Sequence, residues 1–164
     1  MIKKTFFLFL LSISSFAQSS LKQLLKKYNQ ETIPYIYVND INTNDDETIF
    51  LDAREKKEFE ISHLKKATYV GYNNFNLKRT LKELPKDKNS KIIVYCSLGV
   101  RSEDIAEKIK AAGYTNVFNL YGGIFEWKNN EKSVYDSQNK LTNKVHAFDK
   151  EWGTWLNKGI KVYE

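Results

Sequence analysis

Cysteine is almost absent from this chain of 164 residues, which contains only Cys96. One cysteine cannot form a disulfide bond within its own chain, so a fold held together by internal disulfides is excluded. The thiol is either a small buried apolar group or a group kept for its chemistry, and the count alone favours neither. Histidine is also scarce, with His63 and His146 far apart in the sequence. We therefore expect no metal site and no cofactor.

Long apolar runs and tracts of one charge are missing as well. The formal net charge is +6, but acidic and basic residues alternate, as in residues 55–58 and 149–151. We therefore expect a mildly basic, solvated surface and no nucleic-acid partner. With 41% hydrophobic and 28% charged residues, the composition is that of a globular protein with room for one ordinary domain.

The N-terminus has the three-part pattern of a secretory signal peptide. Lys3 and Lys4 precede an apolar run at residues 5–13, which is too short for a comfortable membrane span, and small residues follow before Gln18. We expect residues 1–17 to be removed on export, which would make the protein periplasmic or secreted. A retained N-terminal anchor is the alternative. No cysteine follows the apolar run, so lipid attachment at a processed N-terminal cysteine is excluded.

Periodicity predicts the organisation of the remaining chain. Residues 18–30 carry apolar side chains at helical spacing, which indicates a short amphipathic helix ahead of Pro34. In residues 31–130 strand patterns alternate with helix patterns, which predicts an α/β domain with a central, mostly parallel five-stranded sheet and helices on both faces. The expected strands are residues 35–38, 48–53, 68–72, 92–95 and 117–120; the expected helices are 55–64, 75–84, 102–112 and 122–127.

Residues 131–164 form an extension of different character. The sequence is polar up to Lys140 and then has apolar and aromatic residues in a loosely helical pattern: Val145, Phe148, Trp152, Trp155 and Leu156. We expect this extension to pack back on the domain. A partner-docking or membrane-surface segment is the alternative, because tryptophans are common at interfaces.

The strongest chemical signal surrounds Cys96. The predicted strand at residues 92–95 leads directly to the thiol, and a helix is expected to begin at once, with Ser102 as its N-cap. Ligands of parallel sheets bind beyond the carboxyl ends of the strands. A helix N-terminus adds backbone N–H groups and partial positive charge, which favour a thiolate and a bound anion.

Four residues separate Cys96 from Arg101, and Gly99 lies between them. A loop this short must curl around the sulfur, and Gly99 permits backbone angles that a side chain would resist. Its N–H groups are then expected to form a nest for an anion or a persulfide. Arg101 would add a permanent cation suited to oxyanions.

Five motifs in order resemble a single-domain rhodanese-like protein, the family of thiosulfate sulfurtransferases. They are L-D-A-R-E at 51–55 with E-F at 58–59, S-H-L at 62–64, V-Y-C-S-L-G-V-R-S at 94–102, A-G-Y at 112–114 and N-L-Y-G-G-I-F-E-W at 119–127. The resemblance implies that Cys96 is the nucleophile that carries sulfur as a persulfide. It implies substrate-binding roles for the loop that follows: Ser97, Leu98, Gly99, Val100, Arg101 and Ser102.

The resemblance also implies scaffold roles for three residues that otherwise look catalytic, namely Asp52, Arg54 and His63. One departure lies at Lys66, where many rhodanese-like proteins have a glycine in the turn. We therefore expect this turn to differ.

The expected function is transfer of a sulfane sulfur from an anionic donor such as thiosulfate, through Cys96, to cyanide or a thiol. The alternative is a non-catalytic persulfide carrier or partner-binding module, with a protein partner recognised through residues 131–164. A cysteine-dependent phosphatase is a third class, but its loop is one residue longer between cysteine and arginine, and a tetrahedral phosphate needs that larger ring.

Overall fold

The structure is a computed structural model that describes residues 21–43 and 45–164. The chain divides into two compact units, residues 1–31 and residues 32–164. In the first unit residues 21–28 are helical, within the range predicted for a helix. The expected signal peptide at residues 1–17 lies outside the described residues. None of the described helices is both long enough and apolar enough to cross a bilayer.

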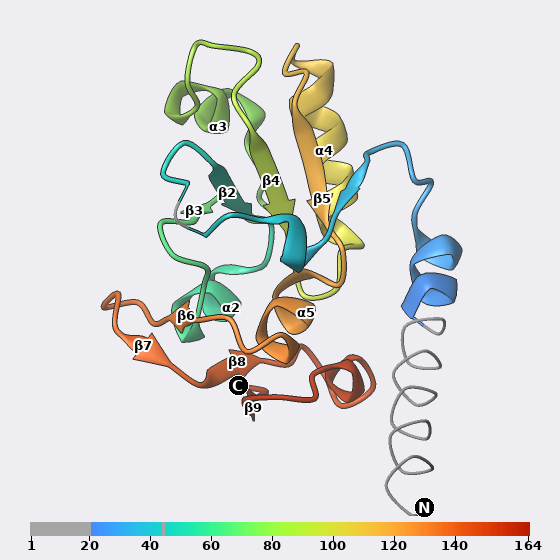
Figure 1. The fold of residues 1–164 in the computed structure, drawn as a ribbon, viewed down its shortest axis with the longest axis vertical. Helices are drawn as coiled ribbons and strands as arrows, with labels where there is room; N and C mark the ends of the chain where they lie inside the picture. Colours follow the sequence, from blue (N-terminus) through green and yellow to red (C-terminus); the bar gives the residue numbers. More distant parts are fainter. Residues whose placement is uncertain (1–20, 44) are drawn as a thin grey trace, which may run out of the picture. The chain divides into compact units, whose positions relative to one another are not determined.

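The second unit is organised around a five-stranded sheet in which every neighbouring pair is parallel (Figure 1). The strand order is β1-β5-β4-β2-β3, with β4 in the centre. The strands are β1 (Tyr35–Ile36), β2 (Ile49–Asp52), β3 (Thr68–Tyr69), β4 (Ile92–Tyr95) and β5 (Val117–Leu120). All four residues of β4 are buried, as expected for a central parallel strand whose two faces are both covered.

Helices cover the sheet, and side chains that alternate along a strand meet different helices. Leu51 and Val94 belong to a core cluster with Ile105 and Ile109, which project from α4. Phe50, the residue before Leu51 in β2, instead makes an edge-on ring contact with Trp127. The helices are α2 (Lys56–Ile61), α3 (Leu77–Glu83), α4 (Arg101–Ala111) and α5 (Gly123–Asn129), and a 3₁₀ turn, η1, spans Val38–Asp40. The predicted α/β fold with a five-stranded parallel sheet is confirmed.

The start of α4 corrects one expectation. Ser102 is predicted as the N-cap, but the helix begins one residue earlier, at Arg101, with Val100 as the N-cap and no capping side chain. The hydroxyl of Ser102 is buried and donates to the side chain of Asn119 on β5 instead. The Ser102 side chain therefore joins α4 to β5 and does not cap the helix.

The aromatic residues of the extension do not form an α-helix, although their spacing is loosely helical. It folds into an antiparallel pair of strands, a 3₁₀ turn and a parallel pair of strands: β6 (Val134–Tyr135), β7 (Leu141–Thr142), β8 (Lys144–His146), η2 (Trp152–Trp155) and β9 (Ile160–Val162). Helical spacing misleads here because Val145 is a buried strand residue, whereas Asp149 accepts from the backbone of Trp152 and starts the turn.

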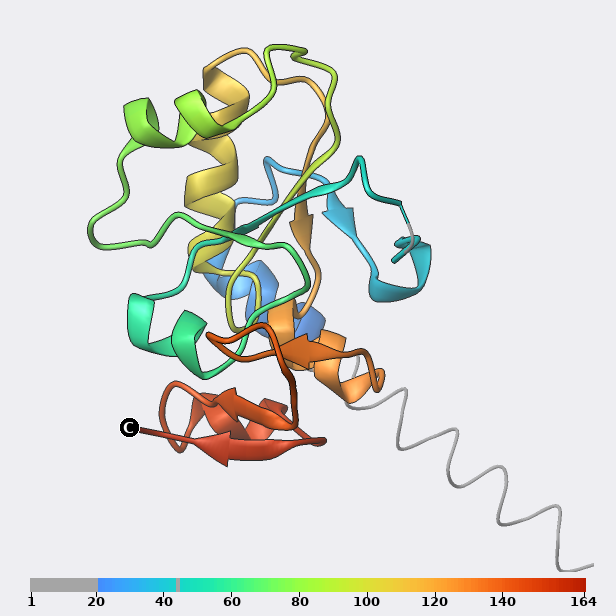
Figure 2. The same ribbon diagram turned by 90° about the vertical axis from the view of Figure 1, so that its left-hand side faces the viewer.

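The extension contacts the domain at several points. Tyr135 pairs with His63 in an antiparallel bridge, and the Asn129 amide donates to the carbonyl of Trp155. Val145 and Leu156 are fully buried. In both views the extension lies with α2 and α5 beyond the carboxyl ends of β4 and β5 (Figures 1 and 2). This places it at the end of the sheet where the cysteine loop begins.

The turn at Lys66 keeps a left-handed backbone although it has no glycine. Lys66 has φ +58°, a conformation that side chains rarely adopt, and its amine pairs with Asp46 at 2.7 Å. Lys66 thus has the positive φ that a glycine would adopt in this turn.

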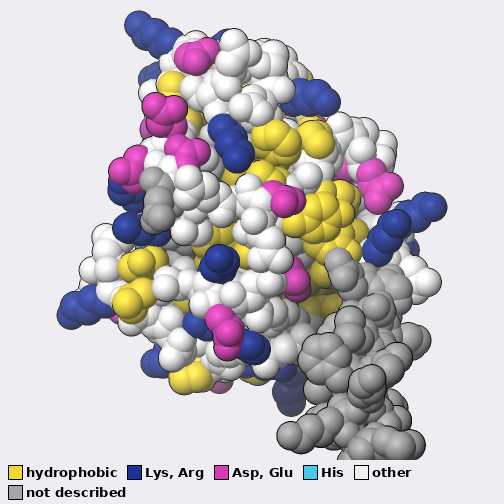
Figure 3. Space-filling view, viewed as in Figure 1, with side chains coloured by type: hydrophobic (Ala, Val, Ile, Leu, Met, Phe, Trp, Pro, Cys, Tyr) yellow, Lys and Arg dark blue, Asp and Glu magenta, His cyan; other side chains and the backbone are white. Residues whose placement is uncertain are grey.

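Charged side chains of both signs are interspersed on the face seen in Figure 3, with apolar patches between them. No tract of a single sign dominates this face.

Candidate active site

Cys96 lies immediately after β4, in the loop that leads into α4. Its side chain is buried, with 2% exposed. The backbone N–H of Gly99 donates to Sγ at 3.1 Å, which is the contact expected of a loop curled around the sulfur. Gly99 has φ +108°, in the range that favours glycine. A donor aimed at the sulfur stabilises negative charge there.

Asn119 fixes the same loop from the neighbouring strand. Its side-chain amide donates to the carbonyl of Gly99 at 2.8 Å, and its side-chain carbonyl accepts from the hydroxyl of Ser102 at 2.7 Å. The Ser102 oxygen is 3.5 Å from Sγ. Sequence reasoning missed Asn119 as a site residue. The available signal was one amide inside the otherwise apolar strand Val117–Leu120.

The N-terminus of α5 holds the loop from a third side. The backbone N–H groups of Ile124 and Phe125 donate to the carbonyls of Cys96 and Ser97, at 2.9 and 3.2 Å. Gly123 permits this approach, since a Cβ atom there would lie 2.3 Å from the Cys96 carbonyl oxygen. Gly123 also has φ +55°. The paired glycines at the start of α5 are therefore part of the cysteine loop's support.

Glu58 on α2 binds Arg101 with both carboxylate oxygens. The two terminal guanidinium nitrogens of Arg101 each donate to one oxygen at 2.8 Å, and one of them also donates to the Ser97 hydroxyl at 3.1 Å. Burial alone would raise the pKa of Glu58, but the hydrogen bonds and charge of Arg101, with the charge of Arg54, lower it to about 2. Sequence reasoning included Glu58 in a motif but gave it no role in the site. Sequence reasoning also assigned the positive charge of Arg101 to oxyanion binding. In the structure Glu58 forms an ion pair with this guanidinium.

Asp52 and Arg54 form a second buried pair, 2.6 Å apart, at the end of β2. Arg54 also donates to the Ser62 carbonyl at 2.6 Å and thereby ties the strand end to the end of α2. Tyr95, whose hydroxyl accepts from the N–H of Leu64, joins the same region to β4. These contacts fit the scaffold roles expected of Asp52 and Arg54.

His63 is held by contacts of the same kind. Its ring stacks on Phe59 with centroids 4.2 Å apart, and Nδ1 lies 2.9 Å from the carbonyl of Leu64. These two contacts join His63 to α2 and to the residue that follows it.

A small cavity of about 110 Å³ opens beside the sulfur. Its lining combines the cysteine loop with two aromatic residues of the extension: Cys96, Leu98, Val100, Arg101, Phe148 and Trp152. The guanidinium carbon of Arg101 lies 5.0 Å from the centre of the Phe148 ring. Sequence reasoning placed these aromatics on the domain but did not connect them with the cysteine.

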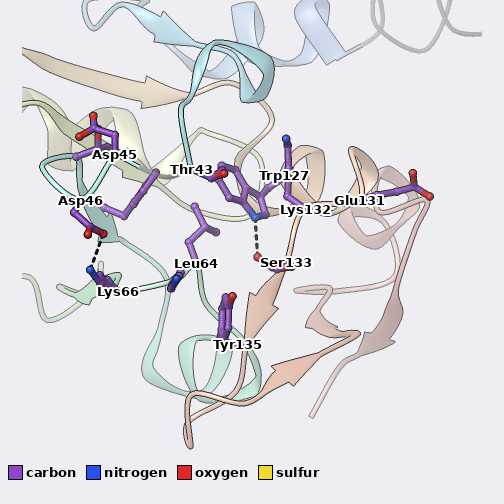
Figure 4. Close-up of a pocket in the computed structure, with 13 residues that line it drawn as sticks. Thr43, Asp45, Asp46, Leu64, Lys66, Trp127, Glu131, Lys132, Ser133 and Tyr135 are labelled. Carbon is purple, nitrogen blue, oxygen red and sulfur yellow. Dashed lines mark hydrogen bonds and ion pairs between the residues drawn. The ribbon is translucent and has the colours of Figure 1, made fainter.

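A larger cavity of about 290 Å³ lies elsewhere, between the loop before β2, the Lys66 turn and the segment after α5 (Figure 4). Trp127 and Lys66 point into this region, where Trp127 donates to the Ser133 carbonyl. None of its lining residues comes from the cysteine loop. Within residues 21–43 and 45–164, no group of three His, Cys, Asp or Glu side chains is placed to hold a metal ion.

The cysteine follows the central parallel strand, and its six-residue loop ends at an arginine, the arrangement on which the resemblance to rhodanese-like proteins rests. Residues 22–130 match the Rhodanese-like domain family. The match spans more than half of the chain, so the chain belongs to this family.

The chain is also similar to curated proteins. The tRNA uridine(34) hydroxylase of Sodalis glossinidius is 28% identical over 130 residues, which make up 77% of this chain and 37% of that protein. The chain thus spans about a third of the length of the curated relatives it matches.

Two solved structures are similar in fold. A rhodanese-related protein of Thermoplasma volcanium superposes with a TM-score of 0.53 at 26% identity, covering 62% of this chain and 96% of that one. The thiosulfate sulfurtransferase of Pseudomonas aeruginosa gives a TM-score of 0.58 over 85% of this chain and 26% of that one. The second likeness, at 18% identity, concerns the fold alone.

The close approach at Gly123 predicts a strong effect of one added methyl group. Gly123→Ala should destabilise the protein by about 2–4 kcal/mol, because the new Cβ meets the Cys96 carbonyl and the backbone is left-handed. Urea unfolding measures this. The matched control is Gly113→Ala, which has φ +96° but no atom within 4 Å of the added carbon. Equal losses for both variants would contradict the role given to Gly123.

The Glu58–Arg101 pair predicts a loss of stability in acid. The folded-state pKa of Glu58, about 2, lies below the ordinary value of 4.5, so its contribution is present above pH 4.5 and is lost as the pH falls towards 2. The shift corresponds to about 3 kcal/mol. Urea unfolding from pH 7 to pH 2.5 should show a smaller acid loss for Glu58→Gln than for the wild type. The control Glu60→Gln, on the exposed side of α2, should keep the wild-type slope.

Proposed function

We propose that the protein is a sulfurtransferase that moves a sulfane sulfur from thiosulfate or a related donor, through a persulfide on Cys96, to cyanide or a thiol. The observation that carries this proposal is the Gly99 N–H aimed at the sulfur inside a loop held by Asn119 and α5. A nucleophile and its charge-stabilising donors are fixed before substrate arrives.

In the first step the Cys96 thiolate attacks the outer sulfur of the donor. A new S–S bond forms to Cys96, the donor's own S–S bond breaks, and sulfite leaves from thiosulfate with the electron pair. In the second step cyanide or a thiolate attacks the outer sulfur of the persulfide, and the Cys96 thiolate is regenerated. The loop's N–H donors stabilise the terminal sulfur anion of the persulfide.

Two other functions receive less support. The phosphatase interpretation is disfavoured by the loop, because only four residues separate Cys96 from Arg101 and the guanidinium is engaged by Glu58. A carrier that acts only with a protein partner keeps the same persulfide chemistry and differs only in needing that partner. Hydroxylation of tRNA, named for the relatives, is not extended to this chain, which matches about a third of their length.

We further propose that the protein is exported, with residues 1–17 acting as a signal peptide. The support is the order of two lysines, an apolar run and small residues before Gln18. In an oxidising compartment, the burial of Cys96 would protect a lone thiol from intermolecular disulfide formation.

Intact-mass measurement after brief treatment with thiosulfate tests the sulfurtransferase proposal. The wild type should gain the mass of one sulfur atom and lose it again when cyanide is added, with release of thiocyanate. Cys96→Ser should gain nothing, because the nucleophile is gone. An equal gain in Cys96→Ser, or no gain in the wild type with any sulfane donor, would overturn the proposal.

A further inference from the structure

The cavity beside Cys96 differs from a simple anion cradle because the extension supplies one of its walls. Phe148 and Trp152 face the loop residues Leu98 and Val100 across the opening to the sulfur. The two aromatic rings meet edge to face, with centroids 6.3 Å apart. The lining beside the sulfur therefore has two aliphatic side chains, Leu98 and Val100, and two aromatic ones, Phe148 and Trp152.

The electrostatics of the same cavity do not favour a highly charged ligand. Among the described residues that line it, Arg101 is the only cation, and Glu58 pairs with its charge. Phe148 also lies over the guanidinium of Arg101. A dianion such as thiosulfate finds no unpaired cation in this lining, whereas a donor with one charge and an apolar group fits both features.

Phe148 is held in this position at a cost in backbone conformation. It has φ +66°, which is a strained conformation for an aromatic residue with a bulky side chain. Its N–H donates to Nδ1 of His146 at 3.1 Å, and the preceding N–H, of Ala147, pairs with Val162 of β9. With 45% of its surface exposed, Phe148 is not a core residue whose burial would explain the strain. Backbone strain clusters at ligand-binding sites. Of the five described non-glycine residues with a positive φ, Phe148 is the one that lines the cavity beside Cys96.

We infer that Phe148 and Trp152 are specificity-determining residues, and that the preferred donor is a sulfane sulfur compound with an apolar organic group next to the reacting sulfur, such as an organic thiosulfonate. This inference rests on the proposed sulfurtransferase function. The Cys96 thiolate attacks the terminal sulfur of R–SO₂–S⁻, the S–S bond to the sulfonyl sulfur breaks, and the sulfinate R–SO₂⁻ leaves with the electron pair. The group R then lies against the two rings during the attack.

Two donors with equal charge and the same reacting atoms isolate the contribution of the group R. Benzenethiosulfonate and methanethiosulfonate differ only in that group, so we compare the ratio of their kcat/KM values, with cyanide as acceptor. In the wild type the benzene compound should be favoured. Phe148→Ala and Trp152→Ala should each lower the ratio by about two- to ten-fold, the size of an aromatic ring contact. Intrinsic reactivity cancels, because the same two donors are compared in each variant.

Control variants separate this effect from a general loss of structure. Phe148→Tyr keeps the ring and should stay within about two-fold of the wild-type ratio. Leu141→Ala removes an exposed apolar side chain of the same extension outside the cavity, and should leave the ratio unchanged. Far-ultraviolet circular dichroism of each variant checks the fold.

The outcomes distinguish this inference from the function on which it rests. If both donors form the Cys96 persulfide but the ratio is the same in the wild type, Phe148→Ala and Trp152→Ala, the specificity role is overturned and the sulfurtransferase function stands. If no donor adds sulfur to Cys96, both are overturned. A lower ratio in the two alanine variants, with the Phe148→Tyr and Leu141→Ala ratios retained, supports the inference.

Discussion

The ion pair between Glu58 and Arg101 sets the electrostatic character of the cysteine site. It joins α2 to the first residue of α4, and Ser97 joins it through a hydrogen bond to the same guanidinium. Removing one partner of a buried ion pair leaves the other charge buried and uncompensated, which lowers the stability of the folded protein. The pair also uses the two terminal nitrogens of an arginine that would otherwise face the substrate. What remains at the sulfur is a backbone donor and an apolar wall.

The rigidity of the loop follows from contacts that converge on a few backbone groups. The carbonyls of Cys96 and Ser97 accept from α5, and the carbonyl of Gly99 accepts from Asn119. With its carbonyls bound on the outside, the loop turns the Gly99 N–H inward towards the sulfur. Catalysis by fixed dipoles depends on this arrangement, because donors that are already oriented need not reorganise as charge moves onto a leaving group.

Much of the fold could be predicted from the sequence because local pattern and tertiary structure agree there. The apolar strand Ile92–Tyr95, the glycine in the cysteine loop and the alternation of strands and helices all point to one architecture. Local patterns gave the wrong structure where residues distant in sequence determine the conformation. Ser102 has the sequence signature of an N-cap, but its side chain bonds to Asn119. Residues 145–156 have loosely helical spacing, but β8 pairs with β9.

The sequence likewise identified only part of the candidate site. Cys96 and its loop could be recognised because they are contiguous in sequence. Glu58, Asn119 and the pair Phe148 and Trp152 come from three other segments, namely α2, β5 and the extension. Nothing in the sequence shows that an aromatic residue 52 positions after Cys96 stands at its cavity, a relation that only the packing of the extension creates.

The central claim is that one sulfur atom passes through Cys96, and isotope tracing tests it most directly. A thiosulfonate labelled only in its outer sulfur is mixed with the protein, and the Cys96 peptide and the thiocyanate formed with cyanide are analysed over time by mass spectrometry. The account predicts that the label appears first on the Cys96 peptide and then in thiocyanate at the same rate at which the peptide loses it. Labelled thiocyanate formed without labelled Cys96, or at the same rate by Cys96→Ser, would contradict it.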